Sequence, residues 1–241
     1  MRRSMGPPQY ALPPLSPVVR NILIGACALF VLELVLNLVQ PELVASLAWY
    51  PLGNGFMLFQ PLTRYLVQGP QPLGFLLSLM VLYFFLPMVF DQFGKGKWVP
   101  ILVFSWAGSV ALGLLADITG FLASTGPAFG WSTLGTACVA LFGLTRPKAV
   151  VNLFFVLPIK AGIFAWGTGL IALLYTLVSR DLNTIQHLGT WCGLMAWWFG
   201  FGPGSRRRKL KAKARKIEKD LKRFTVLDGG QEDSNRGDWV N

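Results

Sequence analysis

A serine and the single histidine of this 241-residue chain are of the types that nucleophilic acyl transfer requires. An imidazole can take the proton of a serine hydroxyl and return it to a leaving amine. His187 stands at the start of HLGTWCG, and Ser132 stands within GWSTLG. The alternative is structural: Ser132 bonds its own helix backbone, and His187 caps a helix or lies near a membrane interface. The elements that carry the two residues must bring them together for chemistry to occur.

The composition predicts a membrane protein built from helices. The chain is 53% hydrophobic and 14% charged, with a mean hydropathy of +0.50, whereas about a quarter of the residues of a soluble domain are charged. Apolar runs of about 20 residues, the length that crosses a bilayer, recur along the chain. We expect an all-α fold with six transmembrane helices, at about 21–39, 73–91, 98–118, 128–145, 159–178 and 183–201.

The distribution of basic residues predicts the orientation. Of the 22 lysines and arginines, only Arg64 and Arg180 fall on one side of a six-span topology. The other side is expected to be the cytosol, because cytosolic loops are enriched in Lys and Arg. We expect a cytosolic segment at 1–20, a membrane domain at 21–202 and a basic cytosolic tail at 203–241, in a multi-pass protein of a bacterial inner membrane. The segment 40–72 carries several aromatic residues, among them Trp49, and is expected at the membrane interface.

The basic tail repeats apolar residues on one face of a helix. Leu210, Ala214, Ile217, Leu221 and Phe224 recur at spacings of four and three, with lysines and arginines between them. Such a helix is suited to binding anionic lipid at the bilayer surface. The alternative is a basic stop sequence that only fixes the topology. Because the charge follows a predicted span, no nucleic-acid partner is expected.

The predicted spans place Ser132 and His187 at a similar depth. At the helical rise per residue, Ser132 lies roughly 21 Å before Arg146 and His187 roughly 22 Å before Gly202, at the cytosolic ends of their spans. Thr136 is the nearest other hydroxyl, but it lies roughly 6 Å deeper. Ser132 is therefore the expected partner of the imidazole, and Thr136 a poorer match.

Contact between a hydroxyl and an imidazole on two helices requires the helices to approach closely, and small residues permit such an approach. Gly130 and Gly135 flank the serine. Gly189 and Gly193 follow His187 in a GxxxG spacing. We expect these glycines to let the fourth and sixth spans touch.

Four stretches of the chain resemble the rhomboid family of intramembrane serine proteases, and the likeness covers most of residues 18–202. FQPLTRYLVQG (59–69) is similar to the start of the family's long first loop, and GKGKWVPILVF (94–104) to the turn into its third span. GWSTLGTACVALFGLTRP with NLFFVLPIKA (130–161) resembles the serine-bearing fourth span and the connection after it, and HLGTWCG (187–193) resembles the histidine helix. The resemblance implies a six-helix bundle in which Ser132 is the nucleophile and His187 its base, with transmembrane proteins as substrates and no cofactor.

The chain departs from the family's pattern around the nucleophile. Thr133 follows the serine where the family has glycine, so Thr133 and Trp131 are expected to crowd the approach. The histidine and asparagine that stabilise the family's oxyanion on the second span fall on Gly74 and Ser78. Ser78 can donate one hydrogen bond, and Gly130 is expected to support the serine backbone. Loss of one oxyanion donor lowers kcat by roughly 10²–10³.

Three functions therefore stay open on the sequence. The first is a working but slow rhomboid-like protease, and the second is a catalytically inactive relative that binds transmembrane clients. The third, a solute channel or transporter, is disfavoured because neither an inverted repeat nor paired intramembrane charges are present.

Glu33 stands within the first span and is expected to face another helix, bonded to a hydroxyl or protonated. Three cysteines lie alone in apolar runs, which supports neither a disulfide framework nor a metal site: Cys27, Cys138 and Cys192.

Overall fold

The structure is a computed structural model that describes residues 15–225 except 53, 70, 124–125 and 154–156. The chain divides into two compact units, Met1–Trp197 and Trp198–Asn241. Most of the predicted segment 1–20 lies outside the described residues. The elements are α1 (Pro17–Val39), α2 (Pro41–Leu47), α3 (Gln60–Thr63), the 3₁₀ turn η1 (Arg64–Leu66), α4 (Pro72–Phe93), α5 (Lys95–Ile118), α6 (Trp131–Thr145), β1 (Val150–Leu153), β2 (Leu157–Lys160), α7 (Ala161–Ser179), α8 (Leu182–Gly200) and α9 (Pro203–Thr225).

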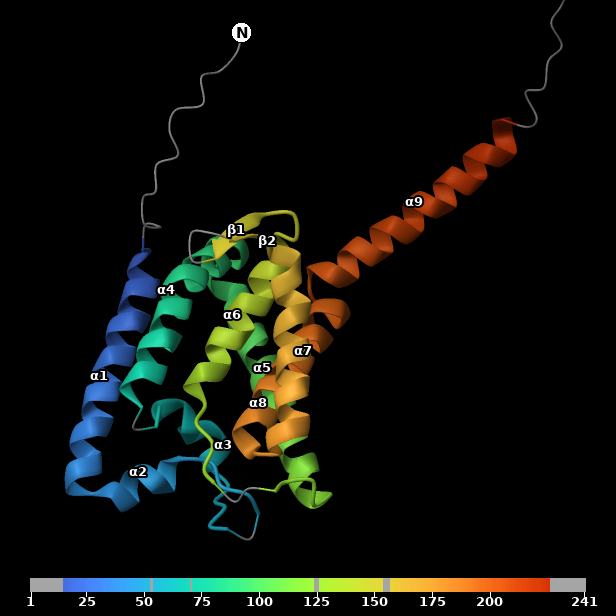
Figure 1. The fold of residues 1–241 in the computed structure, drawn as a ribbon. Coiled ribbons are helices and arrows are strands. Elements are labelled where there is room, and N and C mark those ends of the chain that lie inside the picture. The colour runs from blue at the N-terminus through green and yellow to red at the C-terminus, as the bar shows by residue number, and fades with distance from the viewer. Residues whose placement is uncertain (1–14, 53, 70, 124–125, 154–156, 226–241) are drawn as a thin grey trace, which may run out of the picture. The chain divides into compact units, whose positions relative to one another are not determined.

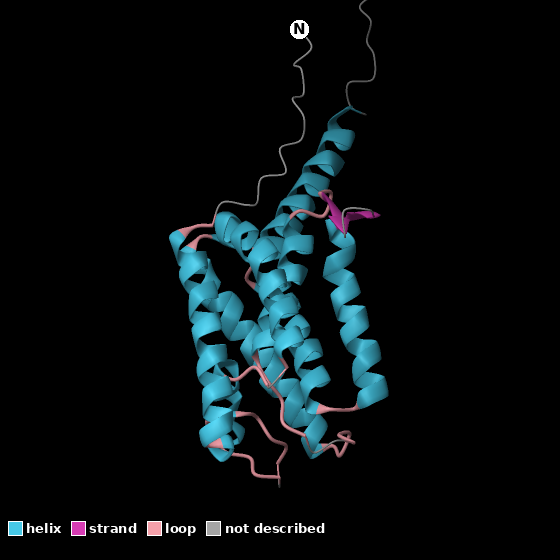
Figure 2. Ribbon diagram, turned by 60° about the vertical axis from the view of Figure 1, so that its left-hand side comes forward, coloured by secondary structure: helices cyan, strands magenta, loops and turns pink. Residues whose placement is uncertain are grey.

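Helices make up most of the described chain, as Figure 2 shows. Four of them, α1, α4, α5 and α7, are long and apolar enough to cross a membrane. The chain is therefore a mostly helical membrane protein, as its composition predicts. Helix α6 has only 15 residues, which span about 22 Å. Helix α8 is not among the four, and its first half carries polar residues that lower its mean hydropathy: Asn183, Gln186 and His187.

The packing of the first unit fixes the start of α6. Helix α6 packs on both α4 and α7, and α4 also packs on α1 (Figure 1). Phe30 of α1 stacks on Phe75 of α4 with 4.1 Å between ring centroids. Both rings belong to a buried apolar cluster that includes Trp131, the first residue of α6. Burial of these large rings contributes to stability in proportion to the apolar area removed from solvent, and it anchors the turn that carries Ser132.

Several predicted span boundaries differ from the helix ends by up to four residues, since α1 begins at Pro17 instead of 21 and α5 at Lys95 instead of 98. Helix α6 begins at Trp131 instead of 128, because the preceding Ala128 pairs as an isolated β-bridge with Trp49. The predicted start of the fifth span at 159 falls within β2, which pairs antiparallel with β1 so that Val150 lies opposite Lys160. Pro158 within β2 has no N–H to donate and disfavours a helix interior, so α7 starts after it.

The connection between α1 and α4 folds inward instead of presenting all its aromatic residues to the interface. Trp49 is only 1% exposed, packs with Leu182 and Ala128, and exchanges two backbone hydrogen bonds with Ala128 at 3.1 and 2.8 Å. Trp49 is therefore a core residue and not an exposed aromatic side chain, whereas the place of the segment 40–72 at the membrane interface stays a prediction. The indole of Trp49 also lies 4.8 Å from the guanidinium of Arg64, a cation–π contact that a buried position strengthens.

The second unit contains the helix that the tail's periodicity predicts. Helix α9 spans Pro203–Thr225. Leu210 and Ile217, seven residues apart and thus on one face, are both more than half exposed. The side chains of Leu221 and Phe224 lie outside the described residues.

Candidate active site

The structure brings the hydroxyl of Ser132 and the imidazole of His187 together. Ser132 Oγ lies 3.2 Å from His187 Nε2, which is within hydrogen-bonding distance. Ser132 is in the first turn of α6 and His187 in the second turn of α8. The two residues are 55 positions apart in sequence, so the contact depends on the depth match between two helices. This arrangement is the geometric requirement for a nucleophile and its base.

Thr136 also contacts the imidazole, on its other nitrogen. Thr136 Oγ1 lies 2.8 Å from His187 Nδ1. The prediction that Thr136 matches poorly is therefore wrong. Ser132 and Thr136 are four residues apart and share one face of α6, and the two ring nitrogens of His187 reach one hydroxyl each.

The glycines after His187 pack on a different helix from the predicted one. A Cβ on Gly189 would lie 2.6 Å from Ser109 Cα of α5, and a Cβ on Gly108 would lie 2.6 Å from Gly193 Cα. The GxxxG spacing thus serves the crossing of α8 with α5 instead of α6. The reason is helical geometry: at about 100° per residue, Gly189 and Gly193 lie roughly 200° and 240° around α8 from His187. The face of α8 that carries the two glycines packs on α5, and the opposite face, which carries His187, points toward α6.

A polar cavity of about 330 Å³ opens beside the pair. Ser132 and His187 line it together with Gly74 and Ser78 of α4, so the two positions inferred for oxyanion stabilisation do lie at the site. Gly74 contributes no side-chain donor there, whereas Ser78 contributes a hydroxyl. The sequence did not single out Asn183, which lines the same cavity. Its spacing of four residues from His187 on a helix was the available signal.

Further space surrounds the pair toward α7. A cavity of about 260 Å³ is lined by Ser132 and Thr136 with Ser78 and Val81 of α4 and Thr168 of α7. A third cavity, of about 300 Å³, is lined by residues of α6, α7 and α8, among them Thr136, Thr168 and His187. The nucleophile and the base are thus reachable from a region bounded by α4, α6 and α7.

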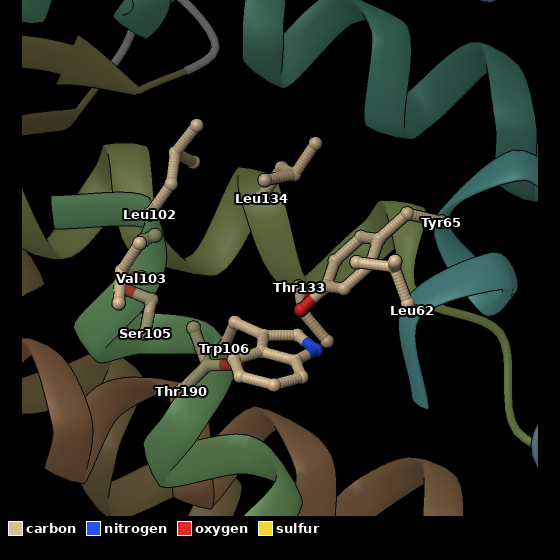
Figure 3. Close-up of a pocket in the computed structure, with 10 residues that line it drawn as sticks. Leu62, Tyr65, Leu102, Val103, Ser105, Trp106, Thr133, Leu134 and Thr190 are labelled. Carbon is tan, nitrogen blue, oxygen red and sulfur yellow. The ribbon is translucent and has the colours of Figure 1, made fainter. Parts of the chain in front are cut away.

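The neighbours of Ser132 in sequence do not crowd its cavity, contrary to the prediction. The Thr133 hydroxyl donates to the carbonyl of Gly130 in its own turn. Its side chain faces a separate, apolar cavity of about 470 Å³ with Tyr65 and Trp106 (Figure 3). Trp131 is buried in the cluster with α1 and α4. Successive residues of a helix point about 100° apart, so neither side chain shares the direction of the nucleophile.

Gly130 supports the site through packing, because its amide already has an acceptor. The Gly130 N–H donates to the carbonyl of Arg64 at 3.0 Å. A Cβ at this position would lie 2.8 Å from the ring of Tyr65 and 2.9 Å from Cγ of Arg64. The amide of Ser132 differs, since it belongs to the first turn of α6, where helix donors lack an intrahelical acceptor. The N-terminus of a helix also favours negative charge.

Arg64 is a buried cation next to the serine turn. Its Nη2 donates to Ser109 Oγ at 2.8 Å and to Tyr65 Oη at 3.0 Å. Nε and Nη1 have no hydrogen-bond partner within the part of the chain described here. Burial lowers the pKa of the Arg64 guanidinium from its ordinary value, and the interaction with Tyr65 opposes the shift. The sequence indicated only a loop charge at this position, and its hydrogen-bond partner Ser109 lies on α5.

Glu33 bonds a loop backbone, so the predicted hydroxyl partner on another helix is wrong, whereas its protonation stays a prediction. Its two carboxylate oxygens accept the N–H groups of Gln68 and Gly69 at 2.7 and 2.8 Å. Gly69 has φ +81°, and a Cβ there would lie 3.0 Å from the ring of Phe129. Gln68, Gly69 and Phe129 all line the cavity of the pair. Glu33 therefore fixes one wall of the candidate site.

The described residues place a serine hydroxyl and an imidazole beside one polar cavity, with the serine in the first turn of a helix, and these are group types that acyl transfer uses. Within those residues, no group of three or more His, Cys, Asp or Glu side chains is placed to hold a metal ion. The three cysteines are free thiols. Neither the comparison of this chain with protein-family models nor that with curated proteins finds a match.

Proposed function

We propose that this chain is a rhomboid-like intramembrane serine endopeptidase with a dyad of Ser132 and His187. The observation that carries the proposal is the 3.2 Å contact between Ser132 Oγ and His187 Nε2 beside a polar cavity. The chain's only histidine meets a serine at a helix N-terminus within a membrane protein. Polar groups within a membrane are costly and therefore rare, so their presence there indicates a functional site.

The dyad performs the reaction in two halves. Ser132 Oγ attacks the scissile carbonyl carbon while His187 Nε2 takes the hydroxyl proton, and a tetrahedral oxyanion forms. The imidazolium then gives its proton to the leaving amine as the C–N bond breaks, which leaves an acyl-serine. A water molecule from the cavity attacks this ester, with His187 again taking and returning one proton, and the second product leaves as a carboxylic acid.

The oxyanion is stabilised by few donors. The Ser132 amide at the start of α6 is the principal one, with the positive end of the helix dipole behind it. Ser78 supplies a hydroxyl from α4, and Gly74 supplies nothing. Because one missing donor reduces kcat by roughly 10²–10³, we expect slow turnover.

The proposed topology has six spans. Four are the long apolar helices α1, α4, α5 and α7, and the other two are the short α6 and the polar α8. Both termini then lie in the cytosol of a bacterial inner membrane, because all basic residues except Arg64 and Arg180 fall on that side. Substrates are transmembrane helices that unwind near their outer end. The cavity bounded by α4, α6 and α7 gives such a segment access to Ser132.

Labelling of the detergent-purified protein with a fluorophosphonate tests the proposal. We expect covalent labelling of the wild type and a loss of roughly 10³-fold or more in the labelling rate of Ser132→Ala and of His187→Ala. Ser46→Ala is the matched control, because this serine bonds a carbonyl of its own helix, α2, and its labelling should equal that of the wild type. Absent labelling of the wild type, or labelling of both dyad variants at the wild-type rate, would contradict the protease and favour an inactive relative that binds transmembrane clients.

We also propose that α9 binds anionic lipid. Leu210 and Ile217 are exposed on one face, and Lys213, Arg215 and Lys216 are exposed on the same helix. Each basic residue near an anionic surface contributes about 1 kcal/mol, and the apolar face adds to this through burial in the interface.

Hydrogen exchange of the full chain in nanodiscs measures the contact of α9 with lipid. We expect slower exchange of α9 in anionic than in neutral lipid, and a smaller difference in the variant Lys213→Gln/Lys216→Gln. The charge-matched control is Lys148→Gln/Lys160→Gln, which removes two exposed charges beside the β1–β2 hairpin. Equal exchange of α9 in both lipids would leave only the topological role.

A further inference from the structure

Thr136 places a second hydroxyl against the imidazole of His187, on the ring nitrogen that does not face Ser132. We propose that Thr136 is a positioning residue that holds His187 in the tautomer whose Nε2 can accept the Ser132 proton. The proposal rests on the proposed function for its purpose, but it concerns a hydrogen bond that can be measured without any turnover.

The geometry places one hydroxyl on each ring nitrogen. Ser132 Oγ is 3.2 Å from Nε2, and Thr136 Oγ1 is 2.8 Å from Nδ1. A neutral imidazole carries one N–H donor and one acceptor nitrogen. For the serine to be activated, Nε2 must be the acceptor, so Nδ1 carries the proton and donates it to a hydrogen-bond acceptor. Thr136 Oγ1, at the shorter of the two distances, provides that acceptor.

The hydroxyl of Thr136 is itself held in place. Thr136 lies in the second turn of α6, and a β-branched side chain has few χ1 states in a helix. Asp181, the residue before α8, directs Oδ1 to the N–H of Thr184 at 2.7 Å. The acceptor for Nδ1 is therefore a neutral oxygen. It fixes the tautomer and the ring orientation, but it stabilises the imidazolium less than a carboxylate does.

The single histidine makes the tautomer directly observable. Because the chain contains one histidine, ¹⁵N labelling of histidine gives an NMR spectrum of His187 alone. We expect a protonated Nδ1 and an unprotonated Nε2 in the wild type at neutral pH. Thr136→Ser retains the hydroxyl and should retain this tautomer, whereas Thr136→Val has a similar shape without the hydroxyl and should give a mixture of both tautomers.

Fluorophosphonate labelling supplies the functional comparison. We expect Thr136→Val to label roughly tenfold more slowly than the wild type, which is the order of effect of one lost neutral hydrogen bond, and Thr136→Ser to label at nearly the wild-type rate. Thr176→Val is the matched control, because Thr176 is a buried threonine of α7 that bonds the carbonyl of Ala172 in its own helix and does not line the cavities beside Ser132 and His187. It should change neither the tautomer nor the labelling rate.

The two readouts separate this proposal from the proposed function. A wild-type spectrum with a protonated Nε2, or an unchanged spectrum in Thr136→Val, overturns the role of Thr136 even if Ser132 labels normally. A tautomer that depends on Thr136 in a protein that never labels supports the hydrogen bond and overturns the protease.

Discussion

Gly193→Ala is expected to destabilise the protein by about 2–3 kcal/mol, although it adds one methyl group to an apolar helix. The added Cβ would lie 2.9 Å from the carbonyl carbon of Phe104 and 3.1 Å from Gly108 Cα. These atoms belong to the α5 backbone, so no rotamer change relieves the contact and the two helices must separate. Overpacking of this kind costs roughly 1–3 kcal/mol, and the separation also loses the close packing of α5 with α8.

The separation should reach the candidate site, because α8 carries His187. We expect a longer distance between Ser132 Oγ and His187 Nε2 and slower fluorophosphonate labelling. The measurement is unfolding of the detergent-purified variant by heat or denaturant, alongside labelling at a temperature where it stays folded.

The matched control is Gly167→Ala on α7, where an added Cβ would meet nothing within 4 Å. Alanine in an open helix position stabilises by roughly 0.5–1 kcal/mol relative to glycine. The two variants make the same chemical change and should shift the unfolding transition in opposite directions. Equal stability of both would show that α5 and α8 do not depend on this contact.

The contact between Ser132 and His187 could be predicted from the sequence, because the helix rise and the charges at the expected span ends place the two residues at a similar level. Ser132 and His187 were level by that count, and their side chains lie in contact. The same count wrongly predicted that Thr136 lies too deep to reach His187, because the count takes no account of the size of the imidazole ring. The ring has two nitrogens that accept or donate along different directions, and it contacts hydroxyls one helical turn apart.

The partner of each helix face was harder to predict than its depth. The glycines of α8 indicated a close helix contact but not its partner, and only the angular position of His187 relative to Gly189 excludes α6. The burial of Trp49 and Arg64 could not be predicted from the sequence, because both residue types are common at interfaces. The burial of Trp49 depends on pairing with Ala128, nearly 80 residues later in the chain, and Arg64 meets Ser109, 45 residues later.

Removal of the Glu33 carboxylate is expected to have the second large effect, on both stability and the candidate site. Glu33→Ala leaves the N–H groups of Gln68 and Gly69 without the acceptors that lie at 2.7 and 2.8 Å. Each unsatisfied buried group costs about 1–3 kcal/mol. Because Gly69 is buried and Gln68 only half-buried, we expect a loss of roughly 2–4 kcal/mol in the free energy of unfolding. Glu33→Gln should lose less, because its one carbonyl oxygen still accepts one of the two N–H groups.

The loss should concentrate at residues 68–69, which line the cavity of Ser132. We expect faster hydrogen exchange of these amides and slower labelling of Ser132, since Gly69 contacts the ring of Phe129 on the same cavity. Glu42→Gln is the control, because Glu42 is an exposed residue in the first turn of α2 and its loss costs at most a few tenths of a kcal/mol through the helix dipole.

Glu33→Gln and Glu33→Ala both remove the charge, but only glutamine keeps a carbonyl acceptor. Their comparison therefore separates the role of Glu33 in holding the loop from the role of its charge. If the role of Glu33 is to hold the loop, exchange at 68–69 should increase in the order wild type, Glu33→Gln, Glu33→Ala, and labelling should fall in the same order. Unchanged exchange at 68–69 in Glu33→Ala would contradict the anchoring. Because Glu33 lies on α1 and contacts neither Ser132 nor His187 by hydrogen bond, a loss of labelling in that order identifies a wall of the cavity held by the first helix.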